Sequence, residues 1–281
     1  MSEKTAPAIQ MTVLSSPENI AVVRHGLAGL AEGLGAAPDL VDDIKTAVSE
    51  AVTNAVVHGY PGSVGPIDVE ASVTERRLEI VVRDQGAGIQ PRPLSDEQTS
   101  LRVGLALIGA LSDEFVVRGE DGGGTELRIS FDLDRGERGE VEQQEHLSAQ
   151  SMPGENEARI AIRRAAASGA AIPKVLEMFV ARADLSIERL SDAHVIGDFL
   201  SNWTSQAVDS KPLNVAITDG EGKVEIRIGP LEPGVGTRML ESNALPGLGN
   251  TLERITDRAE ITRTDTDAGP AEYLVLELRS D

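Results

Sequence analysis

The chain has 281 residues, and its 46 acidic and 26 basic side chains give a formal net charge of −20 at pH 7. Such a charge repels phosphates and argues against direct binding to nucleic acid, while the absence of cysteine excludes disulfides and thiolate metal sites. No apolar run reaches membrane-spanning length and the start lacks a signal-peptide core, so we expect a two-domain cytoplasmic protein without membrane contact.

Hydrophobic periodicity predicts an α/β domain over residues 1–133. In chain order the pattern predicts strand 8–14, helices 17–34 and 39–58, strands 66–74 and 77–84, a polar lid, helix 103–112, and strands 114–119 and 124–132. We expect a two-layer sandwich, in which helices cover one face of a mixed or antiparallel sheet.

The first candidate site lies in the helical segment Asp42–Tyr60. Glu50 and Asn54 are four residues apart, so both side chains project from one face of the helix. An amide oxygen is a hard ligand that suits Mg²⁺, and a carboxylate can accept a proton from an attacking hydroxyl. The pair by itself is more typical of a helix whose polar side faces water.

The second candidate site follows strand 77–84. Asp84 ends the strand, and Gly86 and Gly88 would let the backbone approach a ligand closely. A carboxylate offers only acceptors, so Asp84 could bind the exocyclic amino group of adenine. An ordinary β-turn uses the same residue types, and it is the alternative for this motif alone.

Two glycine-containing segments complete the pattern. Gly104 is predicted to open helix 103–112, where a phosphate could meet free backbone N–H groups. Gly122–Thr125 precedes the last strand of the domain. Each segment alone has a structural explanation, whereas their order and spacing together indicate a nucleotide site.

This order resembles the ATP-binding fold shared by sensor histidine kinases, gyrase, Hsp90 and MutL. The resemblance is strongest to the branch of anti-sigma-factor serine/threonine kinases, and it extends over roughly residues 8–133. The residues that carry it are Ser49–Ala55, His58-Gly59-Tyr60 and Val82–Ile89.

The resemblance implies ATP and Mg²⁺ as ligands, and a sigma factor and an anti-sigma-factor antagonist as partners. It implies that Glu50 is the catalytic base, that Asn54 binds ATP and Mg²⁺, and that Asp84 contacts adenine. The remaining implied positions are ATP-binding Gly86, Gly88, Gly104 and Thr125, and Arg24 as a partner contact.

Two departures from the family pattern affect catalysis. The lid, Gln90–Leu101, is short, and Arg102-Val103-Gly104 keeps only the second glycine of the usual Gly-x-Gly. Phosphoryl transfer depends on positioning, which a short lid would impair. An interaction regulator gated by ATP is therefore the alternative to a kinase. A histidine-kinase output domain fits less well, because no dimerisation helix with a phosphoacceptor histidine adjoins the domain.

The rest of the chain is predicted to be an acidic linker, 134–157, and a second domain, 158–281. The segment 158–182 is expected to be a helix broken near Gly169 and Pro173. From Pro212 onward the sequence resembles a faded copy of the first domain, in the same element order. In the two hairpins an offset of 146 residues aligns Val69 with Val215 and Val82 with Ile228, and in the last strands Leu127 is aligned with Tyr273. Chance similarity between two sandwich domains is the alternative to a tandem duplication.

The second copy is expected to lack catalysis. Pro230 stands at the position of Asp84, Glu232 at that of Gly86 and Ala271 at that of Thr125, although Asp198 and Asn202 keep the four-residue spacing of the first helix pair. We expect the copy to pack on the first domain as an internal stand-in for a second subunit, giving an intramolecular pseudo-dimer. The alternative is a homodimer.

Overall fold

The computed structural model describes residues 8–74, 76–86, 96–119, 123–133, 152–162, 170–206, 212–241, 251–266 and 269–280. The chain divides into two compact units, Met1–Pro153 and Gly154–Asp281. Most of the predicted linker, residues 134–151, lies outside the described residues. Among the described helices, none combines the length and hydropathy needed to cross a membrane.

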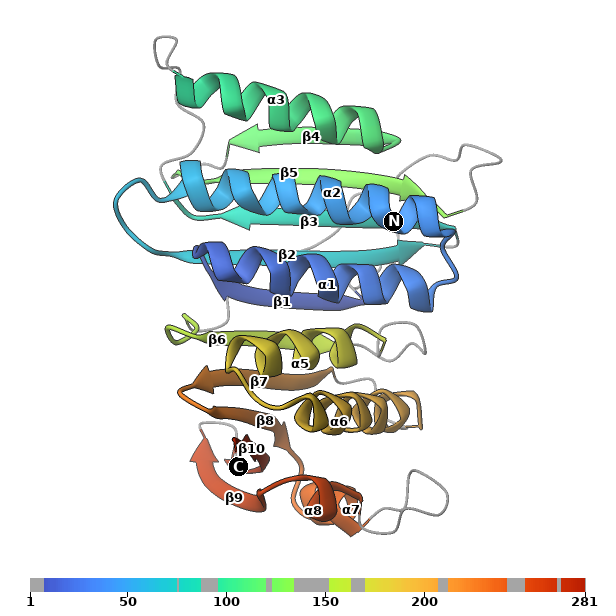
Figure 1. Cartoon of the computed structure of the whole chain (residues 1–281), viewed down its shortest axis with the longest axis vertical. Coiled ribbons are helices and arrows are strands. Elements are labelled where there is room, and N and C mark those ends of the chain that lie inside the picture. The colour runs from blue at the N-terminus through green and yellow to red at the C-terminus, as the bar shows by residue number, and fades with distance from the viewer. Residues whose placement is uncertain are drawn as a thin grey trace. The chain divides into compact units, whose positions relative to one another are not determined.

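The first unit is a five-stranded antiparallel sheet with helices on one face (Figure 1). Its strands are ordered β4-β5-β3-β2-β1. The elements are β1 Ile9–Leu14, α1 Pro17–Gly33, α2 Pro38–Asn54, the π-helix η1 Ala55–Gly59, β2 Pro66–Thr74, β3 Arg77–Asp84, α3 Asp96–Leu111, β4 Glu114–Gly119 and β5 Thr125–Asp132.

Side-chain alternation explains the two faces of this sheet. Along β1, β2, β3 and β5, every second residue is apolar and most of these are buried, as in Leu78-x-Ile80-x-Val82 of β3, whereas β4 is largely exposed. The intervening residues of these four strands are mostly polar, among them Glu79 and Arg83, and buried Val81 is an apolar exception. Asp84 continues the apolar series, so it points to the side of the sheet where the helices lie.

Two helices differ from the prediction. The predicted helix 39–58 changes from α to π geometry after Asn54, and η1 ends at Gly59. The helix predicted at 103–112 begins at Asp96, so Gly104 lies inside α3 and does not open it.

The second unit repeats the architecture of the first. Its strands are ordered β6-β7-β8-β10-β9, with all neighbours antiparallel, and α5 and α6 lie on one face of the sheet (Figure 1). The elements are β6 Glu157–Ile162, α5 Ala171–Arg182, α6 Ile187–Gln206, β7 Leu213–Gly220, β8 Lys223–Leu231, α7 Val235–Glu241, α8 Thr251–Ile255, β9 Arg258–Thr266 and β10 Gly269–Arg279.

The prediction of a helix over 158–182 is wrong at its start. Glu157–Ile162 is strand β6, which pairs with β7 in the position that β1 holds beside β2. Ala171–Arg182 is helical, as α5. The complete repeat of strand and helix order therefore begins at Glu157.

The sheet register corrects one part of the internal alignment. Val69 faces Val82 and Val215 faces Ile228, as the sequence alignment of the two hairpins requires. In the last strands, however, Leu127 faces Val82 whereas Leu274 faces Ile228. The alignment that paired Leu127 with Tyr273 is therefore shifted by one residue, and a register irregularity between Glu272 and Leu274 accounts for the shift.

Candidate functional site

Glu50 and Asn54 lie together at the contact between α2 and α3. Both side chains are partly buried and project from the same side of α2. A methyl group built on Gly104 would lie 2.9 Å from Glu50 Oε2 and 3.4 Å from Asn54 Oδ1. The structure thus brings these three predicted residues together, and only a glycine fits at position 104 without displacing the carboxylate.

The position of Gly104 changes what its backbone can do. As an interior residue of α3, it has its N–H within the helical hydrogen-bond ladder, where a phosphate cannot reach it as at a helix start. Gly104 instead provides space for Glu50 and Asn54. The prediction that it opens a helix over phosphate is wrong for this reason.

Asp84 forms the second part of the site, at the end of β3. Its side chain is 4% exposed, and its Oδ1 accepts a hydrogen bond from the Gly86 N–H at 3.0 Å. The carboxylate faces η1, because a methyl group on Gly59 would lie 3.0 Å from both its Cγ and its Oδ1. Thr125 pairs with Asp84 across β3 and β5 and is partly exposed.

Close backbone contacts fix the turn after Asp84. A methyl group on Gly86 would lie 1.8 Å from the Gly59 carbonyl oxygen, so no larger residue fits there. A methyl group on Gly124 (φ +103°) would lie 2.3 Å from the Asp84 carbonyl oxygen. Sequence reasoning missed Gly59 and Gly124 as parts of the site, although both belong to quoted motifs, because their contacts are with residues distant in sequence.

Two other predicted site residues are less defined. Gly88 lies outside the described residues. Arg24 lies in α1 with a partly exposed side chain, and its role in contacting a partner stays a prediction.

The side-chain amide of Asn54 could bind a ligand. Asn54 Nδ2 is buried and has no hydrogen-bond partner among the described residues. The oxygen and nitrogen of an amide exchange places by a half-turn of the side chain, so an oxygen ligand can be presented at this position. No group of three acidic or histidine side chains suited to a metal occurs in the described part of the chain. Mg²⁺ would therefore depend on Asn54 together with nucleotide phosphates, which is its usual mode with phosphate substrates.

The corresponding region of the second unit has different chemistry. Glu272 is 2% exposed; its carboxylate accepts the Gly234 N–H at 2.8 Å and pairs with Arg263 at 3.1 Å. Asp198 is half-exposed, and its Oδ2 lies 3.6 Å from His194 Nε2. Glu272 pairs with Leu231 at the end of β8, so the second unit has a buried carboxylate beside this strand end.

The comparisons with known proteins concern the first unit. Residues 13–131 match the histidine kinase-like ATPase domain family. The serine-protein kinase RsbW of Bacillus licheniformis is 35% identical over 134 residues, which cover 43% of this chain and 83% of that protein. The anti-sigma F factor of Clostridium acetobutylicum is 33% identical over 127 residues, covering 42% and 89%. The chain belongs to the anti-sigma-factor serine-protein kinase family.

The family match ends before the second unit. Membership in this family implies that the first unit binds ATP. A solved histidine kinase domain, from the Erythrobacter litoralis EL346 blue-light activated histidine kinase, is 27% identical over 34% of this chain and 46% of its own, with a TM-score of 0.29.

Proposed function

We propose that the first unit is an ATP-dependent serine/threonine protein kinase. It would bind a sigma factor in the cytoplasm and phosphorylate an anti-sigma-factor antagonist. The observation that carries this proposal is the convergence of Glu50 and Asn54 on Gly104, in a chain whose relatives include a serine-protein kinase and an anti-sigma factor.

In this proposal Glu50, Asn54 and Asp84 each have a separate role in the reaction. The Glu50 carboxylate would take the proton of the substrate hydroxyl as its oxygen attacks the γ-phosphorus of ATP, while the bond to the bridging oxygen breaks and ADP leaves. Asn54 would hold Mg²⁺, which neutralises phosphate charge when bound. The Asp84 carboxylate would accept a hydrogen bond from the adenine amino group.

A regulator that binds ATP without transferring phosphate is the second candidate. The backbone of α3 lies against the Glu50 carboxylate at Gly104. In this alternative, nucleotide binding moves α3 and changes the affinity for the partner. The second unit, with Pro230 and buried Glu272, would bind no nucleotide in either case.

Nucleotide binding and phosphotransfer separate these candidates. With labelled ATP and a candidate antagonist, wild-type protein should bind one nucleotide per chain and transfer phosphate. Glu50→Gln should lower the transfer rate by about 10²- to 10⁴-fold with little change in nucleotide affinity. Asn54→Ala and Asp84→Asn should both lose nucleotide binding.

Asp42→Asn is the matched control, because Asp42 lies on the same helix with its side chain 75% exposed. It should behave as wild type. Binding without transfer would favour the gated regulator, and unchanged binding in both Asn54→Ala and Asp84→Asn would refute the site.

A further inference from the structure

Tyr60 connects two strands through one hydroxyl group. It follows η1 directly, and its hydroxyl donates a hydrogen bond to the Pro66 carbonyl at 2.6 Å. The same oxygen accepts the N–H of Gln85 at 2.8 Å. The first residue of β2 and the first residue after Asp84 are therefore held by a single side chain.

The ring of Tyr60 is fixed as firmly as its hydroxyl. A methyl group on Gly65 would lie 2.1 Å from the ring Cε1, so the ring rests directly on the glycine backbone. Gly65 is in turn held by Ser15, whose hydroxyl accepts the Gly65 N–H at 3.0 Å and whose own N–H donates to the Gly65 carbonyl at 2.8 Å. Tyr60 thus has little freedom to move relative to β1 and β2.

The environment of Tyr60 keeps its hydroxyl protonated. Burial raises the pKa of Tyr60 to about 12; the hydrogen bond from Gln85 opposes this change, and the negative charges of Asp84 and Asp68 add to it. The donor bond to Pro66 is therefore retained throughout the neutral pH range.

We propose that Tyr60 is a positioning residue that makes the nucleotide site select an amino-bearing purine. The inference rests on the proposed function of Asp84. By holding Gln85, Tyr60 fixes the backbone immediately after Asp84, and Gly59 fixes the carboxylate itself. A carboxylate that cannot move accepts the amino group of adenine and opposes the carbonyl oxygen of guanine, since both of its oxygens are acceptors.

Tyr60→Phe tests this role, because it removes both hydrogen bonds and keeps the ring on Gly65. Dissociation constants for ADP and GDP are measured on the full chain, together with the melting temperature. We expect ADP affinity to fall about 3- to 10-fold, which corresponds to the loss of about one hydrogen bond. GDP affinity should stay constant or rise, so the preference for ADP over GDP falls.

Tyr273→Phe is the control, because Tyr273 is the other of the two tyrosines and belongs to the second unit. Its nucleotide preference should equal that of wild type. In this variant Tyr60 is the only tyrosine, so the change in tyrosine absorbance during an alkaline titration reports the ionisation of Tyr60 alone. That ionisation should fall near pH 12.

Three results would overturn the proposal. If Tyr60→Phe keeps the wild-type preference for ADP over GDP while Asp84→Asn loses ADP binding, Tyr60 does not set the preference. The assignment of Asp84 to the nucleotide site would then still hold. If Tyr60→Phe loses ADP and GDP affinity equally and has a lower melting temperature, Tyr60 serves only to stabilise the fold. Absence of ADP binding by wild-type protein would overturn the proposed function as well.

Discussion

Arg83 is a charged residue that the first sheet keeps nearly buried. Its Nη1 lies 2.8 Å from Glu70 Oε2 and its Nε lies 2.9 Å from Glu126 Oε2, with the three side chains 9–10% exposed. Because side chains alternate along a strand, Arg83 points away from the face on which the next residue, Asp84, lies. The ion pairs therefore join β2, β3 and β5 beside the candidate site without entering it.

Replacement of Arg83 should destabilise the first unit strongly. Arg83→Met leaves two nearly buried carboxylates without their shared partner, and a broken buried pair typically costs about 3–5 kcal/mol of unfolding free energy. Urea unfolding followed by hydrogen exchange of β3 and β5 amides measures this change. Lys45→Met is the control, because the exposed pair of Lys45 with Asp42 should contribute less than about 1 kcal/mol.

The same variant should show a defined pH dependence. Burial alone would raise the pKa of Glu126, but the hydrogen bonds and charges of Arg83 and Arg128 hold it below the usual glutamate range. A lowered carboxyl pKa stabilises the fold above the unfolded-state pKa, and this stabilisation is lost as pH falls through the folded-state pKa. The difference between wild type and Arg83→Met should therefore shrink in acid; a constant difference would contradict the assigned charges.

At the scale of elements, the turn between α3 and β4 in the first unit has the same hydrogen bonds as the turn between α8 and β9 in the second. In the first unit Asp113 donates its N–H to the Ser130 carbonyl at 3.0 Å, and its Oδ2 accepts the Asp132 N–H at 2.7 Å. In the second unit Asp257 makes the same two bonds, to the Glu277 carbonyl at 2.9 Å and from the Arg279 N–H at 2.8 Å. This shared detail supports a common origin more specifically than strand order does.

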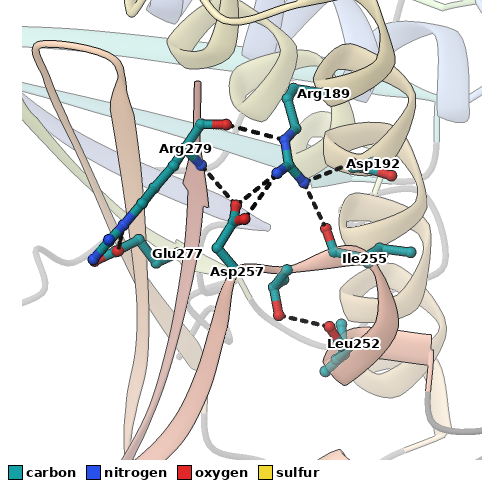
Figure 2. Close-up of polar contacts among 8 residues, drawn as sticks. Arg189, Asp192, Leu252, Ile255, Asp257, Glu277 and Arg279 are labelled. Carbon is teal, nitrogen blue, oxygen red and sulfur yellow. Dashed lines mark hydrogen bonds and ion pairs between the residues drawn. The ribbon is translucent and has the colours of Figure 1, made fainter. Parts of the chain in front are cut away.

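The second unit adds an arginine to this connection. Figure 2 shows Arg189, near the start of α6, directed at Asp192, at Asp257 and at the carbonyls of Ile255 and Arg279. The distances are 2.8–3.4 Å, and the side chain is 15% exposed. Arg189 therefore ties α6 to the end of α8 and to β10.

Loss of Arg189 should weaken the second unit. Arg189→Ala removes hydrogen bonds from two carboxylates and two carbonyls, so we expect a cost of about 1.5–3 kcal/mol of unfolding free energy. Fluorescence of Trp203, the single tryptophan, reports this unit because it lies in α6 beside Phe199. Arg258→Ala, which breaks a more exposed pair with Glu260, should cost less than about 1 kcal/mol. Equal effects of the two substitutions would show that the connection does not stabilise the unit.

At the scale of the whole molecule, two units with one strand order suggest an internal partner. We propose that the second unit takes the place of a second subunit, so that the chain stays monomeric. Light scattering should then give the 29.7 kDa mass of one chain over a wide range of concentration. A stable homodimer whose mass does not change with dilution would contradict this proposal.

The sequence alone predicted most of the first unit. Strands β2, β3 and β4 have the predicted bounds, because regular alternation between turn residues determines a strand locally. Glu50 and Asn54 were placed on one helix face by their spacing, and Asp84 at a strand end by the glycine that follows. These features depend only on residues close together in the chain.

Only the tertiary structure decided the rest. Arg159, Ala161 and the arginine- and alanine-rich residues that follow favour a helix locally, yet Glu157–Ile162 is a strand because it pairs with β7. Gly104 lies within a helix, against Glu50, and η1 brings Gly59 to Asp84 and Tyr60 to Gln85. The sequence thus determined most elements of the first unit and the positions of Glu50, Asn54 and Asp84 on them, whereas contacts between distant segments, which local propensity does not encode, decided how those residues are held.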